Sequence, residues 1–273
     1  MSSRTWFITG SSRGFGYEWA RAALARGDRV VGTVRDAATV ADLRAAHPDT
    51  FLDLTLDVRD RAAVFAAVDR ARAHFGTLDI VVNNAGYGQF GMVEELSEAE
   101  AREQIETNLF GALWVTQAAL PHLRAAGSGH ILQVSSIGGI TAFPGIGMYH
   151  ASKWALEGIS QSLAQEVAGF GIKVTLIEPG GFSTDWAGPS ARHAESLAAY
   201  DEVRAARDRS RAARAPGDPV ASAAAVLRIV DAAAPPLRAF LGTAPLGLAE
   251  ADYASRLAIW REWQPVAELA QGV

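Results

Sequence analysis

Short apolar runs alternate with longer amphipathic stretches along most of the chain. Seven runs rich in valine, isoleucine and leucine predict buried strands, at residues 5–9, 29–34, 51–56, 78–83, 130–135, 173–178 and 237–241. Helical patterns separate them, at residues 15–26, 39–46, 61–75, 98–123, 149–168 and 220–232. Continuous apolar strands that alternate with helices predict right-handed crossovers. The predicted fold class is therefore α/β, with a doubly wound parallel sheet.

The pattern changes after Pro179. Residues 181–218 are rich in glycine, alanine, serine and arginine, and they predict a lid with a helical piece at residues 194–213. Residues 243–273 form a C-terminal extension, in which residues 248–269 predict a helix that carries Tyr253, Trp260 and Trp263. Neither a repeat nor a long linker divides the chain, so we expect residues 1–273 to form a single domain.

Composition narrows the possible functions. The 273 residues carry a formal net charge of −5, which favours neither nucleic acid nor an anionic membrane as a partner. The chain has no cysteine, which excludes disulfides and thiolate chemistry, and its six histidines form no ligand pattern, so no metal site is expected. No apolar run has the length of a membrane span or the character of a signal peptide, so we expect a cytoplasmic protein.

A glycine-rich loop follows the first predicted strand. Gly10, Gly14 and Gly16 lie within the stretch TGSSRGFG, just where a helix is predicted to begin. Glycines there permit a sharp turn and let backbone N–H groups approach a pyrophosphate at the helix N-terminus. The same glycines can also serve only to pack helix on strand. The strand–loop–helix context favours a dinucleotide site.

The end of the second strand indicates whether the dinucleotide is NAD(H) or NADP(H). A site that prefers NAD places a carboxylate there for the ribose 2′-hydroxyl. This chain has Arg35 instead, and Arg13 in the glycine loop, and a guanidinium suits a 2′-phosphate. Asp36 is expected to begin the next helix. Both arginines can also be solvated surface residues, but their joint placement predicts NADP(H) rather than NAD(H).

Further motifs follow in order, with Asn83-Asn84-Ala85-Gly86 first, then Asn108, Ser136 and Tyr149-x-x-x-Lys153. With the glycine loop, this set resembles the short-chain dehydrogenase/reductase family, in its single-domain branch, over about the first 185 residues. The resemblance implies a Rossmann fold. It also implies a cofactor site that includes Gly10, Ser12, Arg13, Gly14, Phe15, Gly16, Arg35, Asp57, Val58, Asn84, Ala85, Gly86, Tyr149, Lys153, Pro179, Gly180, Phe182 and Thr184.

The predicted chemistry centres on Tyr149. Tyr149 and Lys153 lie one helical turn apart on one face, so the lysine ammonium should lower the phenol pKa and also hold the nicotinamide ribose. Ser136 precedes them, after the fifth strand, and its hydroxyl can orient a substrate oxygen. In the family that the chain resembles, an asparagine at the position of Asn108 supports a proton relay to the lysine. Each residue alone also has a structural interpretation, and together they predict an acid–base site.

The predicted reaction interconverts a secondary alcohol and a ketone or aldehyde. Loops after the strands supply a mostly apolar set of predicted substrate contacts, Gln89, Ile137, Phe143, Met148 and Trp186, which favours a hydrophobic substrate. The arginines of the lid (Arg192, Arg204, Arg207, Arg209, Arg211 and Arg214) are either a solvated helix face or a site for an acidic partner. The resemblance implies a dimer or tetramer, because the helices at residues 98–123 and 149–168 commonly pair between subunits in that family. The C-terminal helix with Trp260 and Trp263 either closes the pocket or joins two subunits.

Two other functions share this fold. One is a nucleotide-sensing regulatory protein without turnover, and the other is a non-redox enzyme such as a cyclase or dehydratase. The presence of Tyr149 and Lys153 favours the oxidoreductase over both.

Overall fold

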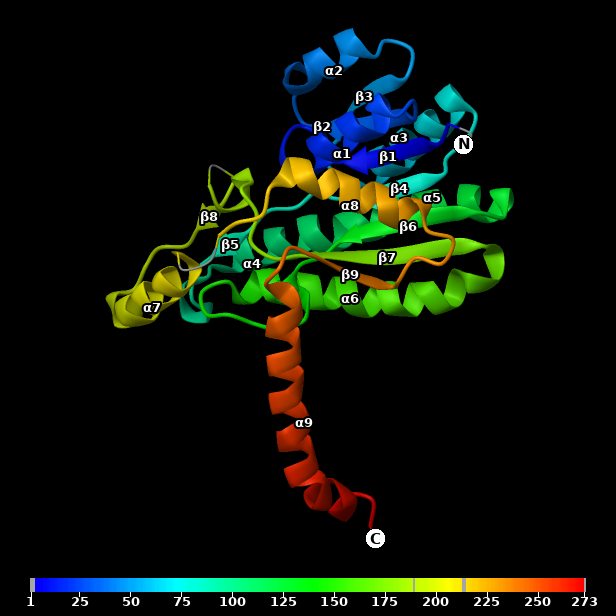
Figure 1. The fold of residues 1–273 in the computed structure, drawn as a ribbon. Helices are drawn as coiled ribbons and strands as arrows, with labels where there is room; N and C mark the ends of the chain where they lie inside the picture. The colour runs from blue at the N-terminus through cyan, green and yellow to red at the C-terminus, as the bar shows by residue number, and fades with distance from the viewer. Residues whose placement is uncertain (1–2, 189, 213–214, 273) are drawn as a thin grey trace.

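A computed structural model describes residues 3–188, 190–212 and 215–272. Its centre is a seven-stranded parallel sheet with the order β3-β2-β1-β4-β6-β7-β9 (Figure 1). The strands are β1 (Thr5–Thr9), β2 (Arg29–Val34), β3 (Phe51–Thr55), β4 (Ile80–Asn83), β6 (Gly129–Val134), β7 (Ile172–Pro179) and β9 (Arg238–Leu241). The chain runs from β1 outward to β3 and then returns to β4, so the strand order reverses between β1 and β4. The doubly wound sheet and its seven strands are confirmed.

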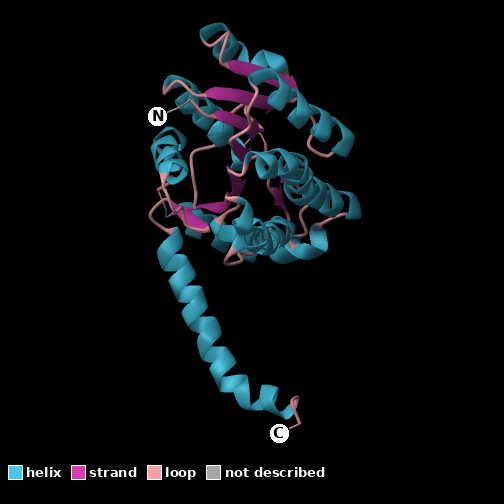
Figure 2. Ribbon diagram, turned by 90° about the vertical axis from the view of Figure 1, so that its right-hand side faces the viewer, coloured by secondary structure: helices cyan, strands magenta, loops and turns pink. Residues whose placement is uncertain are grey.

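Helices cover both faces of the sheet (Figures 1 and 2). They are α1 (Gly14–Ala25), α2 (Ala41–Ala46), α3 (Arg61–Phe75), α4 (Glu98–Ile105), α5 (Gly111–Ala126), α6 (Gly147–Val167), α7 (Asp201–Ala212), α8 (Pro219–Asp231) and α9 (Pro245–Leu269). Single 3-10 turns are η1 (Ala37–Val40), η2 (Val93–Glu95), η4 (Ile137–Gly139), η5 (Ala168–Phe170), η6 (Asp185–Ala187) and η7 (Ala198–Tyr200). Within the described residues, no helix combines the length and apolar character needed to cross a membrane.

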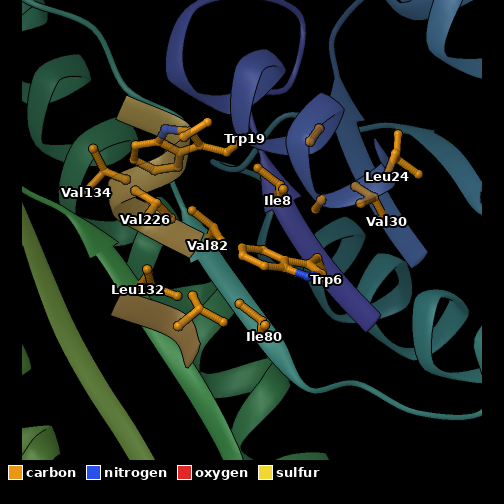
Figure 3. Packing of buried hydrophobic residues seen from close by; sticks show 14 of the residues in the cluster. Trp6, Ile8, Trp19, Leu24, Val30, Ile80, Val82, Leu132, Val134 and Val226 are labelled. Atoms are coloured by element: carbon orange, nitrogen blue, oxygen red, sulfur yellow. The ribbon is translucent and has the colours of Figure 1, made fainter. Parts of the chain in front are cut away.

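Two apolar clusters fix these helices to the sheet. On one face, Trp6, Trp19 and Val226 are buried between the strands, α1 and α8 (Figure 3). The two indole N–H groups are satisfied, since Trp6 donates to Asp28 over 2.8 Å and Trp19 donates to Ser222 over 2.8 Å. The other face packs against α3, α5 and the end of α6. Burial on both faces explains why the strands read as continuous apolar runs.

The predicted helix at residues 98–123 is correct in place but not continuous. It consists of α4, a π-helical segment η3 (Glu106–Phe110), and α5, which extends to Ala126. A π turn holds one residue more than an α turn and is common at functional sites. Asn108 lies in this widened turn.

The lid and the extension differ from prediction at their starts. The lid helix α7 begins at Asp201 rather than near residue 194, because Arg192–His193 form strand β8, which pairs with β5 (Gln89–Phe90). Ala213 and Arg214, also assigned to the lid, lie outside the described residues. The extension helix α9 begins at Pro245, since proline suits the first helical turn. Beyond its first turns, α9 projects away from the body (Figures 1 and 2).

Candidate active site

The carboxyl ends of the strands open onto one cavity of about 520 Å³. This is where ligands bind in doubly wound sheets, and the volume is within the usual range of ligand sites. All of the predicted cofactor residues except Gly16 line this cavity, as do Tyr149, Lys153, Ser136 and Asn108. The sheet thus brings together residues that are up to 174 positions apart, from Gly10 to Thr184.

Gly16 shapes the cavity from behind. A Cβ atom on Gly16 would lie 2.4 Å from the Gly10 carbonyl oxygen and 2.5 Å from Asn84 Nδ2, so only glycine lets α1 start this close to the loop. Gly10 itself has a φ of +69°, a conformation that favours glycine. The loop therefore presents backbone N–H groups at the N-terminus of α1, and the residues fit the pyrophosphate of a dinucleotide.

The end of β2 supplies a cation to the cavity. Arg35 lines the cavity, whereas the neighbouring Asp36 caps η1, accepting a hydrogen bond from the Ala38 N–H over 2.9 Å. Arg13 lies at the same end, where it forms a 3.7 Å ion pair with Asp185. Asp57 also lines the cavity, and its hydrogen bond to Arg59 holds its pKa below the usual range.

Tyr149 and Lys153 are buried side by side in the first turns of α6. The Lys153 ammonium lies 5.8 Å from the centre of the Tyr149 ring and donates a 2.7 Å hydrogen bond to the carbonyl of Val134. Burial raises the pKa of Tyr149 to about 12, although a hydrogen bond to Ser136 acts in the opposite direction. Burial also lowers the pKa of Lys153 to about 8.

The pKa of Tyr149 therefore differs from the sequence-based expectation that Lys153 lowers it. In this structure burial of the phenol is the largest influence on its pKa, because the ring is enclosed and the ammonium donates to a strand carbonyl. Burial therefore favours the neutral form of the Tyr149 phenol.

Asn108 is held by the backbone opposite it. Its side chain forms two hydrogen bonds with Tyr87, accepting from the N–H over 3.1 Å and donating to the carbonyl over 3.0 Å. A third bond, of 3.3 Å, reaches Ser152 on α6. The π turn thus allows Asn108 to connect the loop after β4 with the helix that carries Tyr149 and Lys153.

A buried pair of carboxyl groups lies behind Lys153. Glu157 is one turn further along α6 and Glu178 is near the end of β7, and both are shielded from solvent. Arg238 on β9 contacts both, with Nε 2.9 Å from Glu157 and 3.5 Å from Glu178. Burial and the neighbouring Glu157 carboxylate raise the pKa of Glu178. Sequence reasoning missed this pair, although Glu157 follows Lys153 at the same four-residue spacing that links Lys153 to Tyr149.

His150 holds the loop that follows Ser136. Its Nδ1 donates to the Gly138 carbonyl over 2.7 Å, and its Nε2 accepts from the Phe143 N–H over 2.8 Å. His150 lies outside the lining of the cavity. Its two hydrogen bonds give it a defined structural task, because Ser136 begins the same loop and accepts from the Gly138 N–H over 2.9 Å.

The substrate end of the cavity differs from the predicted set. Of the five residues, only Trp186 lines it, with its ring 4.8 Å from Tyr149 and 5.3 Å from Phe90. Gln89 is buried instead, because its side chain donates to Glu100 over 3.0 Å. Ile137 and Phe143 pack in a cluster with Ala249 at the start of α9. Met148 is half-buried and outside the lining of the cavity.

Two arginines of the lid complete this end. Arg192 lies 4.7 Å above the ring of Tyr87 and forms an ion pair with Glu103, and Arg211 also borders the cavity. Arg204 instead anchors the lid to the body through a 2.6 Å ion pair with Glu95. The sequence did not distinguish these tasks, since the partners are more than 80 residues away.

Comparison with known proteins identifies the family. A family model described as short chain dehydrogenase matches residues 4–195, about 70% of the chain. The chain belongs to the short-chain dehydrogenase family. It is 41% identical over 244 residues to "Oxidoreductase BOA17" of Botryotinia fuckeliana, covering 88% of this chain and 89% of the relative. It is also 39% identical over 185 residues to a 3-ketodihydrosphingosine reductase of Bacteroides thetaiotaomicron, covering 67% of this chain and 66% of that relative.

Solved structures agree. A short-chain dehydrogenase from Streptomyces avermitilis superposes with a TM-score of 0.93 and 39% identity, covering 98% of both chains. An alcohol dehydrogenase from Thermococcus sibiricus, complexed with 5-hydroxy-NADP, has a TM-score of 0.74 and 26% identity, covering 88% of this chain and 96% of that one. The predicted resemblance is confirmed, and the chain is an NAD(P)-dependent dehydrogenase/reductase of this family.

Proposed function

We propose that this short-chain dehydrogenase is an NADP(H)-dependent oxidoreductase that interconverts a hydrophobic ketone or aldehyde and its alcohol. The observation that carries the proposal is the position of Tyr149. Its phenol borders the same cavity as the glycine loop, with Ser136 beside it and the Trp186 ring 4.8 Å away. When bound, the nicotinamide cofactor supplies or accepts the hydride.

Four side chains manage the substrate oxygen and its proton in this proposal. Ser136 holds the oxygen, and Tyr149, a neutral phenol, gives the proton during reduction. The Lys153 ammonium stabilises the phenolate that remains and binds the ribose hydroxyls. Asn108 keeps the loop after β4 against α6. It thereby fixes the position of the groups beside a proton relay to Lys153.

This arrangement has a defined pH dependence. Because burial lowers the pKa of Lys153 to about 8, its positive charge is lost above that pH. Tyr149 remains protonated there, since its pKa is raised to about 12. We therefore expect kcat/KM for reduction to fall above about pH 8, and a constant rate up to pH 10 would contradict the assigned role of Lys153.

The preference for NADP(H) rests on the end of β2. Arg35 faces the cavity, while the carboxylate that could serve a ribose hydroxyl, Asp36, is engaged as a helix cap. A charged hydrogen bond to a phosphate contributes roughly 1.5–3 kcal/mol, or about 10- to 100-fold in affinity. Arg35→Ala should raise the KM for NADPH by that factor and leave the KM for NADH within 3-fold (about 0.6 kcal/mol). Arg102→Ala, at an exposed pair on α4, is the matched control. An equal loss for both cofactors would contradict the preference.

A hydrophobic substrate is supported by the aromatic wall. Trp186 and Tyr87 offer flat apolar surface near Tyr149, and Arg192 covers Tyr87 while its charge is paired with Glu103. The relative from Bacteroides thetaiotaomicron is named a 3-ketodihydrosphingosine reductase, and a substrate of that class would fit such a wall. A panel of aliphatic, aromatic and charged ketones, followed by loss of reduced-nicotinamide absorbance, tests this class.

The decisive test of the function is Tyr149→Phe. The variant keeps the ring beside Trp186 but lacks the proton, so we expect kcat to fall by at least about 10³-fold with NADPH affinity within 3-fold. Tyr253→Phe, an exposed tyrosine on α9, is the control for the same chemical change. Turnover retained in Tyr149→Phe would overturn the mechanism, and loss of NADPH binding would mean that the ring is structural.

A further inference from the structure

Helix α9 extends far beyond the body that supports it. Its 25 residues give a length of about 37 Å at 1.5 Å per residue. Only the first turns are anchored, since Pro245 and Ala249 are buried. Arg256, two turns beyond Ala249, donates to the Ile140 carbonyl over 3.2 Å and lies 4.7 Å above Trp154. From Leu257 to Leu269 every residue is exposed, and the helix runs free of the body (Figures 1 and 2).

The free part of α9 is unusually apolar for exposed surface. Trp260 and Trp263 have 57% and 60% of their surface exposed. They belong to two adjacent stripes at helical spacing, formed by Tyr253, Leu257, Trp260 and by Ile259, Trp263, Val266. At about 100° per residue, these stripes cover roughly half of the helix circumference, with Ala254 and Ala258 on the opposite side. Continuous apolar patches of this kind mark interaction surfaces.

The chain exposes more surface than a compact monomer of its mass. A compact monomer of 28.9 kDa is expected to expose about 11,400 Å². This chain exposes 13615 Å², which leaves an excess of about 2,200 Å². A standard interface hides about 800 Å² on each partner, and permanent homodimers hide more. The excess is therefore enough for a permanent dimer contact.

The pose of α9 also has a counterpart in a solved protein. The short-chain dehydrogenase of Streptomyces avermitilis matches 98% of this chain with a TM-score of 0.93. The unmatched 2% of 273 residues is about five residues, fewer than the 25 of α9. Most of the projecting helix is thus part of the superposition, so its direction is a property of the fold rather than of a free tail.

We propose that α9 is a dimerisation arm whose exposed apolar half, from Tyr253 to Val266, packs against a second copy of this chain. Two arms related by two-fold symmetry cover each other's apolar stripes, and the assembly is then closed at two copies. Tryptophan and tyrosine are the residues enriched in the core of such interfaces. A lipid surface is less suited to this helix, because α9 carries only two arginines and four carboxylates, Glu250, Asp252, Glu262 and Glu268.

The test compares two double variants of the full chain by light scattering after size exclusion. Trp260→Glu with Trp263→Glu places two charges within the apolar half, and it should halve the mass of the parent assembly and weaken self-association at least 100-fold. Ala254→Glu with Ala258→Glu places the same charges on the opposite side of the same helix, and it should keep the parent mass. Far-ultraviolet circular dichroism and cofactor binding check that both variants are folded, which both should be because all four substituted side chains are exposed.

Three results would overturn the arm. They are a parent chain that is monomeric at micromolar concentration, a tryptophan variant that keeps the parent mass, and an alanine-site variant that dissociates equally. A monomeric parent that sediments with phosphatidylcholine vesicles would assign the apolar half to a lipid surface instead. A red shift of tryptophan emission when the parent is diluted, absent from the tryptophan variant, is the second expected readout.

Discussion

The two ends of the cavity are built in different ways. At the cofactor end, the wall consists of strand ends and the glycine loop, where the sheet itself fixes the backbone of Gly10, Arg35 and Asn84. At the substrate end, the wall consists of side chains such as Trp186, Arg192 and Arg211, which come from a single turn, a two-residue strand and the helix α7. One end is determined by backbone register, and the other by contacts between segments that are distant in sequence.

This difference determines how each end should respond to change. Backbone atoms near Gly16 cannot move without moving β1 and α1. A substitution there should therefore affect both the stability of the fold and cofactor binding. The lid residues are held by individual ion pairs and ring contacts, each of which is worth little alone. Substitutions there should change substrate use and leave cofactor binding intact.

The largest effect is expected for Gly16→Ala. The new Cβ would meet a carbonyl oxygen at 2.4 Å, and this backbone atom cannot yield as a side chain would. We expect a loss of about 3 kcal/mol in the free energy of unfolding, together with loss of NADPH binding. Gly158→Ala on α6, where a Cβ meets nothing within 4 Å, should change stability by less than about 1 kcal/mol. Urea unfolding measures both, and similar values would contradict the rigid cofactor end.

Trp186→Ala should have the next largest effect, and only at the substrate end. It removes ring contacts with Tyr149 and Phe90, and we expect kcat/KM for a hydrophobic ketone to fall about 10- to 30-fold. The dissociation constant of NADPH, measured by fluorescence titration, should stay within 3-fold, about 0.6 kcal/mol. A parallel loss of cofactor binding would show that the two ends are not independent.

His150→Phe should have a smaller effect, confined to the Ser136 loop. The change removes both hydrogen bonds that hold Gly138 and Phe143, which together contribute roughly 2 kcal/mol. The loop should loosen, and because only part of this energy acts on the reaction, kcat should fall about 10-fold. The KM for NADPH should not change. Because glutamine can restore one of the bonds, His150→Gln should recover part of kcat, and a purely structural loss would not show this recovery.

The last expected effect concerns the pH dependence of stability at Glu178, which lies outside the lining of the cavity. Burial raises its pKa above the usual 4.5, so the folded state keeps a proton that the unfolded chain releases as pH rises. Stability should therefore fall with increasing pH from about 4.5 until the raised pKa is passed, by at most about 1.4 kcal/mol per pH unit. Glu178→Gln should flatten this slope in thermal unfolding between pH 6 and 8. An unchanged slope would contradict a buried protonated carboxyl group.

The same contrast explains what the sequence could predict. The strands and the doubly wound sheet follow from local patterns, because apolar runs have direct backbone consequences. Most of the residues at the glycine-loop end of the cavity were expected from the family resemblance instead. Arg35 and Asp36 were separated correctly by position alone, one at the strand end and the other as a cap.

The substrate wall could not be predicted in this way. Gln89 is polar and follows a strand, yet its side chain is buried and its amide donates a hydrogen bond to the carboxylate of Glu100. Phe143 is aromatic and near Tyr149 in sequence, yet it joins a cluster with Ile137, Ile140 and Ala249 that includes the start of α9. The pKa of Tyr149 depends on how completely the ring is enclosed, and spacing to Lys153 does not contain that information.

The π turn at Glu106–Phe110 makes the number of residues in this helix matter as much as their identity. Deleting one residue from the turn would convert it into an ordinary α turn and rotate Asn108 by about 100° relative to α5. The amide would then leave Tyr87 and Ser152, although no functional side chain had been exchanged. In chains related to this one, a single-residue gap aligned to this stretch would therefore be as informative about lost function as a replaced asparagine.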